Sequence, residues 1–165
     1  MTTQTLPQVG HEHHEQILQH VDGLPALADR LLAAKGAGMA AEIAEVEAFL
    51  TEILLPHVAA AEANLYPELE RMYQNRHSMT PMRREHEQLR RLATEHARLV
   101  DQVAAGRVSL GQTLALRRVL FQLYALLKIH LAEEEIYLRI VDHGVDADVA
   151  DLIGAALDHP GFRPE

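Results

Sequence analysis

Apolar residues recur at helical spacing along almost the whole chain, and no segment alternates apolar and polar residues with a period of two. The first predicted helix spans residues 11–34. Its apolar stripe consists of Ile17, Leu18, Val21, Leu24, Ala28, Leu31 and Leu32. Pro25 falls within this stripe, so we expect a bend or break there. Residues 35–38 contain two glycines and predict the turn that ends the helix.

The second predicted helix spans residues 39–73, and its core face is formed by Ile43, Val46, Leu50, Ile53 and Leu54. Pro56 and Pro67 lie within this pattern, and we expect a kink at each of them because proline has no backbone N–H. A polar loop follows. Thr80 and Pro81 then read as an N-cap and a proline at the first helical position, which predicts a third helix over 81–105.

The fourth predicted helix opens at Ser109, is apolar on most sides from Leu114 to Leu131, and ends at Gly144. Four long helices joined by short turns predict an all-α fold, an up-down-up-down four-helix bundle. A short amphipathic helix is expected after it. We therefore divide the chain into a flexible N-terminus (1–10), the bundle (11–143), and a short helix with a tail (144–165).

The amino-acid composition excludes several classes of functional site and binding partner. The chain of 165 residues has no cysteine, which excludes disulfides, thiolate metal sites and cysteine nucleophiles. Its formal net charge of −9 argues against nucleic-acid binding. No apolar run is long enough to cross a membrane and no secretory signal is visible, so we expect a cytoplasmic protein. The apolar fourth helix would also allow a homodimer. The unusual feature is a content of 11 histidines, which suggests metal chemistry.

Polar groups interrupt the apolar stripe of the fourth helix. His130 and Glu134 lie four residues apart on the stripe of Leu120, Leu123 and Leu127, so both side chains can reach one ion. A carboxylate at such a position is costly unless it is paired or bound to a metal. The alternative is one satisfied core histidine beside a solvated acidic helix end that includes Glu133 and Glu135.

The other helices supply further candidates. On the second helix, His57 continues the core face, Ala61 lies one turn later, and Glu62 is about 100° away from the centre of the stripe. On the third helix, His86 and His96 are roughly 15 Å apart along the axis, too far to share one site, so His96 is expected in the core.

The first helix offers His14 on its inward face, with His13 on the flank as the alternative. Inward imidazole and carboxylate groups from several helices suit iron, and a pair of ions would need a bridging carboxylate.

These residues resemble the hemerythrin-like family (the HHE cation-binding domain), whose pattern is His, His-x3-Glu, His and His-x3-Glu on successive helices. The best-matching stretches are residues 12–14, 55–67, 84–86 and 130–137. The resemblance implies a four-helix bundle with metal ligands His14, His57, His86, His130 and Glu134.

The sequence departs from the family pattern twice. Ala61 stands at the position of the second-helix glutamate, and Arg90 stands where some members have a second third-helix histidine. Glu62 is our candidate for the missing carboxylate. Because some members use a carboxylate five residues after the fourth-helix histidine, Glu135 is an alternative to Glu134.

The resemblance implies a non-haem iron protein, with two irons per chain or a mononuclear site, that binds or reacts with O₂, peroxide or nitric oxide. Two other functions stay open: a metal-responsive sensing or storage module, and a helical interaction protein that has lost its metal. The sequence does not decide whether the protein is an enzyme.

Overall fold

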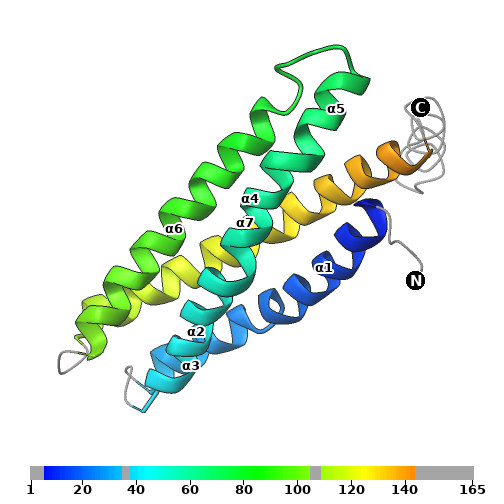
Figure 1. Ribbon diagram of the computed structural model, residues 1–165. Helices are drawn as coiled ribbons and strands as arrows, with labels where there is room; N and C mark the ends of the chain where they lie inside the picture. Colours follow the sequence, from blue (N-terminus) through cyan, green and yellow to red (C-terminus); the bar gives the residue numbers. More distant parts are fainter. Residues whose placement is uncertain (1–5, 35–37, 105–108, 144–165) are drawn as a thin grey trace, which may run out of the picture.

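The computed structural model of the chain describes residues 6–34, 38–104 and 109–143, and every regular element in these ranges is a helix (Figure 1). The elements are α1 (Leu6–Val21), α2 (Leu24–Ala33), α3 (Ala40–Ala48), η1 (Phe49–Leu54), α4 (Leu55–Ala60), η2 (Ala61–Leu65), α5 (Tyr66–Met72), α6 (Thr80–Ala104) and α7 (Leu110–His143), where η denotes a π-helix. The short C-terminal helix predicted within 144–165 lies outside the described residues.

The first long helix is broken where the proline predicted it. α1 ends at Val21, and α2 begins at Leu24 with Pro25 in its first turn, where a missing backbone N–H costs no hydrogen bond. α1 begins at Leu6, earlier than the expected start at His11. α1 and α2 together form the first of the four long helical segments of the bundle.

The second long helix runs from α3 to α5 and contains two π-helical turns, and a proline is the second residue after each of them. η1 ends one residue before Leu55-Pro56, and η2 ends one residue before Tyr66-Pro67. In both places the residue before proline bonds five residues back, from Leu55 N–H to the Leu50 carbonyl and from Tyr66 N–H to the Ala61 carbonyl. Proline cannot make the next helical bond and crowds the preceding turn, so the helix widens there and continues. The expected kinks therefore take the form of wide turns.

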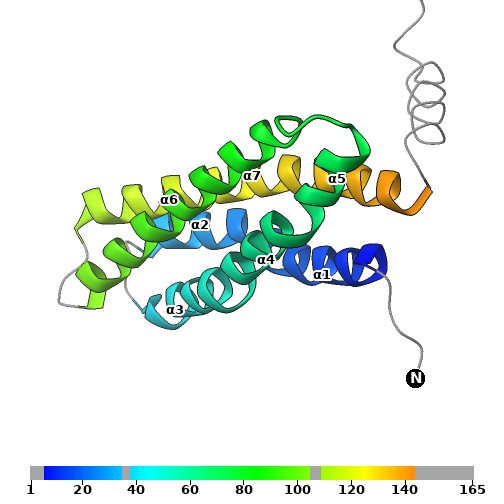
Figure 2. The ribbon, with the colours of Figure 1, turned by 45° about the horizontal axis from the view of Figure 1, so that its top comes forward.

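The four long helical segments form an up-down-up-down bundle, as the sequence predicted (Figures 1 and 2). α7 contacts α1, α2, α5 and α6, while α3 packs on α6. Most buried apolar residues belong to one cluster that includes Leu50, Leu123 and Leu127, and a smaller cluster around Leu69 and Met82 fills the end formed by α5, α6 and α7. None of the helices in the described ranges is both long and apolar enough to cross a membrane.

The start of α1 lies beside the end of α7 at one end of the bundle (Figures 1 and 2). Their contact is close at Gly10, where any β-carbon would lie 2.8 Å from the Cδ atoms of Leu138. Glycine at this position therefore leaves room for the Leu138 side chain. Along the same contact between α1 and α7, His11 lies beside Glu135 and His14 beside Glu134.

The burial of α7 makes a prediction about stability. Leu123→Ala should lower the free energy of unfolding by about 2–5 kcal/mol, because Leu123 is completely buried and its removal leaves a cavity. Leu114→Ala on the same helix should change it by less than about 0.5 kcal/mol, since Leu114 is 47% exposed. Urea unfolding of both variants checks this, and equal losses would contradict the burial of Leu123 in the core.

Candidate metal centre

Each of the four long helical segments contributes one histidine to a single level in the bundle core. These are His14 from α1, His57 from α4, His86 from α6 and His130 from α7, and Glu134 follows one turn after His130. All five side chains are buried, with at most 6% of any residue exposed. Each histidine lies on the apolar face of its helix, so the packing of the bundle turns it inward.

The carboxylate of Glu134 lies between two pairs of histidines. Its Oε2 atom is 3.1 Å from His14 Nε2 and 3.0 Å from His57 Nε2. Its Oε1 atom is 3.7 Å from both His86 Nε2 and His130 Nε2. The donor atoms thus form two compact groups that share Glu134, the α1/α4 triad (His14, His57, Glu134) and the α6/α7 triad (His86, His130, Glu134). Each triad holds two imidazoles and one carboxylate oxygen.

Tyr66 belongs to the same site, although its position in the sequence did not single it out as a candidate. The phenol is fully buried, donates a hydrogen bond to Glu134 Oε1 at 2.5 Å, and lies 2.9 Å from His86 Nε2. Burial and the charge of Glu134 hold the pKa of Tyr66 far above its usual value. The wide turn η2 shifts the helical register so that Tyr66 faces the core, and a regular helical projection misses this shift.

Outer carboxylates set the orientation of the α6/α7 histidines. His86 Nδ1 is 3.0 Å from Glu62 Oε1, and His130 Nδ1 is 2.9 Å from Glu85 Oε2. An ionised carboxylate can only accept, so each Nδ1 carries the proton and each Nε2 lone pair points to the centre. This is the arrangement in which metal-binding histidines are usually held.

His14 is held more loosely. Its Nδ1 atom is buried without a hydrogen-bond partner, although Glu135 Oε2 lies 3.4 Å away. Glu135 is hydrogen-bonded instead to His11 Nδ1, at 2.9 Å. Glu135 is therefore outside both triads, which contain Glu134, the carboxylate four residues after His130.

The remaining sequence candidates lie outside the triads. Glu62, the candidate for a bridging carboxylate, is behind His86 on the side away from Glu134 and is bonded to Arg90. His13 belongs to neither triad; its ring centre is 5.3 Å from that of His57, and burial followed by the nearby histidines lowers its pKa. His96 is buried elsewhere on α6 and pairs with Glu47, its Nδ1 lying 2.7 Å from the carboxylate.

Burial sets the charge state of the site. It lowers the pKa of His86 and of His130 to about 4, so both imidazoles are neutral at neutral pH. Burial alone would raise the pKa of Glu134, but hydrogen bonds from His14 and His57 and the charge interaction with His130 outweigh it and hold that pKa well below its usual value. The α6/α7 triad therefore combines an anionic carboxylate with two neutral imidazoles.

A count of protons shows that the α6/α7 triad fits a cation. His86 and His130 each use their single proton at Nδ1, yet their Nε2 atoms lie 3.0 Å apart. Four acceptor atoms therefore face one another with only the hydroxyl proton of Tyr66 between them. They are the two Nε2 atoms, Glu134 Oε1 and the Tyr66 oxygen. Such acceptors repel one another in a low-dielectric core, and a metal ion between them would remove the repulsion.

A cavity of about 180 Å³ adjoins the α1/α4 triad. It is lined by Gly10, His13, His14, His57, Ala60, Ala61, Asn64, Leu65, Glu134 and Leu138. Ala61, at the position where the resemblance implies a glutamate, is one of its walls. The small methyl group there leaves space next to the two histidines.

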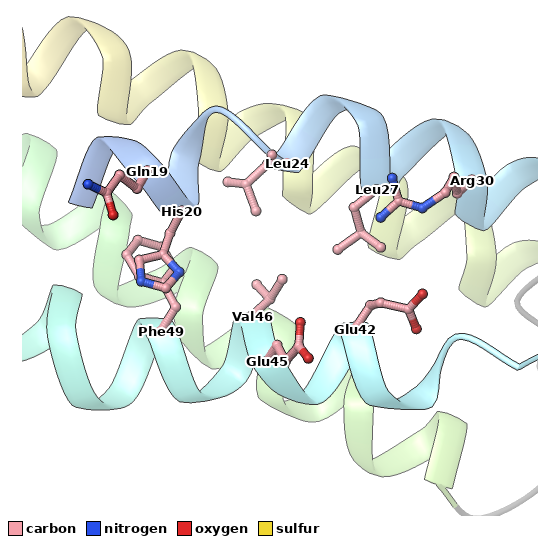
Figure 3. A pocket seen from close by; sticks show the side chains of 10 residues that line it. Gln19, His20, Leu24, Leu27, Arg30, Glu42, Glu45, Val46 and Phe49 are labelled. Atoms are coloured by element: carbon pink, nitrogen blue, oxygen red, sulfur yellow. The ribbon is translucent and has the colours of Figure 1, made fainter. Parts of the chain in front are cut away.

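A second hollow, of about 210 Å³, lies between α2 and α3, with the apolar side chains of Leu24 and Leu27 facing Val46 (Figure 3). Arg30 and Glu42 lie on opposite sides of it (Figure 3). None of the triad residues lines this hollow. It is therefore separate from the candidate metal centre.

The metal-free protein should lose stability as the pH falls from about 6.5 to about 4. The unfolded chain protonates these histidines near pH 6.5, whereas His86 and His130 resist protonation until about pH 4 when folded. Between these values the unfolded state binds more protons, so acid favours it, by a few kcal/mol at the low end. Urea unfolding across this pH range measures the slope. The double variant His86→Gln/His130→Gln should flatten it, and His77→Gln, which alters an exposed histidine, should not.

Comparison with known families agrees with this geometry. The family model of the hemerythrin HHE cation-binding domain matches residues 8–141, which include all the triad residues and Tyr66. No curated protein and no solved structure gives a significant match. Because the matched region spans most of the sequence and contains the whole buried histidine and carboxylate cluster, the chain belongs to the hemerythrin HHE cation-binding domain family.

Proposed function

We propose that the protein is a non-haem iron protein that holds two iron ions per chain, one in each triad. The observation that carries this proposal is the position of Glu134, whose two carboxylate oxygens face two different pairs of buried histidines. A set of two histidines and one carboxylate with open positions is the donor set of many non-haem iron sites. A shared carboxylate would also offset part of the charge of two neighbouring cations.

Each triad would hold one of the two ions. His14 and His57 would hold one ion and His86 and His130 the other, with Glu134 between them. Tyr66 would supply an oxygen donor to the α6/α7 ion, since its hydroxyl already lies within 3 Å of both Glu134 and His86. In this way Tyr66 would take the place of the second-helix glutamate of the family pattern, whose position is occupied by Ala61 in this chain. Iron in such a site would supply an open coordination position to which O₂, peroxide or nitric oxide would bind or at which it would react.

The size and lining of the cavity beside Ala61 support the proposal that the ligand is small. Its volume of about 180 Å³ suits a molecule of a few atoms, and its walls at Ala60, Ala61 and Leu138 are apolar. The lining residues Ala60 and Asn64 are exposed, so the cavity is open to solvent and a small ligand can enter it. We infer that this cavity admits the ligand to the α1/α4 triad.

The interpretation as a metal-depleted interaction protein is weaker on physical grounds. A bundle core that serves only packing gains nothing from a fully buried carboxylate and four buried imidazoles, because apolar side chains of similar volume would be at least as stable. A sensing or storage module shares the same metal site. It predicts that iron raises the melting temperature, and this alone does not separate it from a ligand-binding role.

Metal content tests the proposal. Protein loaded with ferrous iron without oxygen should contain about two irons per chain, and Glu134→Gln should lose both because it removes the shared charge. Glu133→Gln is the matched control, since it removes the same charge from the neighbouring residue, which lies outside both triads, and should retain both ions. His57→Ala should retain one. A wild-type chain that takes up no iron would rule the proposal out.

The variant Tyr66→Phe tests whether the phenol oxygen of Tyr66 binds iron. Ferric wild-type protein should show the visible charge-transfer absorption of an iron-bound phenolate, and Tyr66→Phe should abolish it while the ring still fills its place in the core. Tyr124→Phe, in the larger core cluster, is the control and should keep the absorption. If the absorption survives in Tyr66→Phe, then Tyr66 is not a ligand.

A further inference from the structure

Arg90 and Glu62 form an ion pair directly behind His86. Arg90 donates from Nη1 to Glu62 Oε1 at 3.0 Å and from Nη2 to Glu62 Oε2 at 2.6 Å. The same Oε1 atom accepts from His86 Nδ1 at 3.0 Å. A chain of contacts thus leads from a half-exposed guanidinium, through one carboxylate, to a completely buried imidazole.

The backbone sets up this chain. His86 and Arg90 are four residues apart on α6 and so lie on the same face of the helix, and Glu62 comes from η2 opposite them. The planar guanidinium holds both carboxylate oxygens at once, which fixes the plane of the carboxylate as well as its distance. The position of Oε1, and with it the direction of the His86 Nδ1–H bond, follows from this double contact.

The other histidine of the same triad lacks such support. His130 donates to Glu85 at 2.9 Å, but among the described residues no guanidinium is hydrogen-bonded to Glu85. The two imidazoles of the α6/α7 triad are therefore oriented by carboxylates of different rigidity, and only the one behind His86 is held by an arginine.

We propose that Arg90 and Glu62 are positioning residues, which fix the His86 ring with Nε2 facing the centre and thereby raise the affinity of the α6/α7 triad for its ion. This inference rests on the proposed function. Glu62 acts from behind the ligand, in place of the bridging role that the sequence suggested, and Arg90 acts only through Glu62. Loss of an outer carboxylate of this kind typically weakens metal binding by 10–100-fold.

The test is a stepwise titration of the metal-free protein with Co²⁺ as the probe ion. Arg90→Gln and Glu62→Gln should each weaken one of the two binding steps by about 10–100-fold and leave the other step unchanged. Arg90→Lys keeps the charge but cannot hold both oxygens, so it should recover only part of the loss. Arg91→Gln is the matched control. It removes the same charge from the next residue, which pairs with Glu87 on the exposed surface, and both steps should stay as in the wild type.

A second measurement needs no metal. Nitrogen NMR of the metal-free wild-type protein should show His86 protonated at Nδ1, whereas Arg90→Gln should shift the proton toward Nε2 in part of the molecules. The inference is overturned if Arg90→Gln leaves both the tautomer and the binding steps unchanged, or if Arg91→Gln has the same effect. If the wild type takes up neither Co²⁺ nor ferrous iron, the proposed function fails, and the tautomer alone then decides whether Arg90 positions His86.

Discussion

The structure depends on one carboxylate placed where a bundle would ordinarily have a leucine. Glu134 is fully buried, and its charge is stabilised by hydrogen bonds from His14, His57 and Tyr66. These partners come from α1 and from α4 and α5, which belong to the second long helix. A single anionic group on α7 therefore links two other long helical segments of the bundle at one level. A buried charge left without partners would cost several kcal/mol, and the helices must therefore keep the relative positions that supply them.

The shape of the second long helix decides what surrounds that carboxylate. Pro56 and Pro67 each interrupt the backbone hydrogen bonds, and the helix responds with two wide turns. The turn that begins at Ala61 brings Tyr66 to Glu134 and leaves only a methyl group beside the small cavity. The π-helical turn at Ala61–Leu65 thus brings a phenol to the centre, and the small Ala61 side chain leaves space beside it, which fits the tendency of π-helical turns to occur at functional sites.

Rigidity around the centre comes from two sources. The larger apolar cluster fills the bundle on one side of the histidines and the smaller cluster closes the other end, so the helices cannot easily slide past one another. Glu62 and Glu85 then hold individual imidazoles by their outer nitrogens. Packing fixes the helices, and hydrogen bonds fix the rings. A compact donor set needs both, because a helix shift or a ring rotation would each separate the Nε2 atoms.

The sequence by itself determined the helices and their order as a four-helix bundle, and it predicted His14, His57, His86, His130 and Glu134 as inward candidates, with His13 and Glu135 left as alternatives. It could do so because a polar residue on an apolar stripe is visible from the spacing within one helix. Only the tertiary structure decided that Tyr66 joins the centre and that Glu62 lies behind His86, bound to Arg90. The wide turns shift the helical register by an amount that no regular projection includes. Contacts such as Glu85 with His130 join different helices, and their pairing depends on which faces meet when the bundle closes.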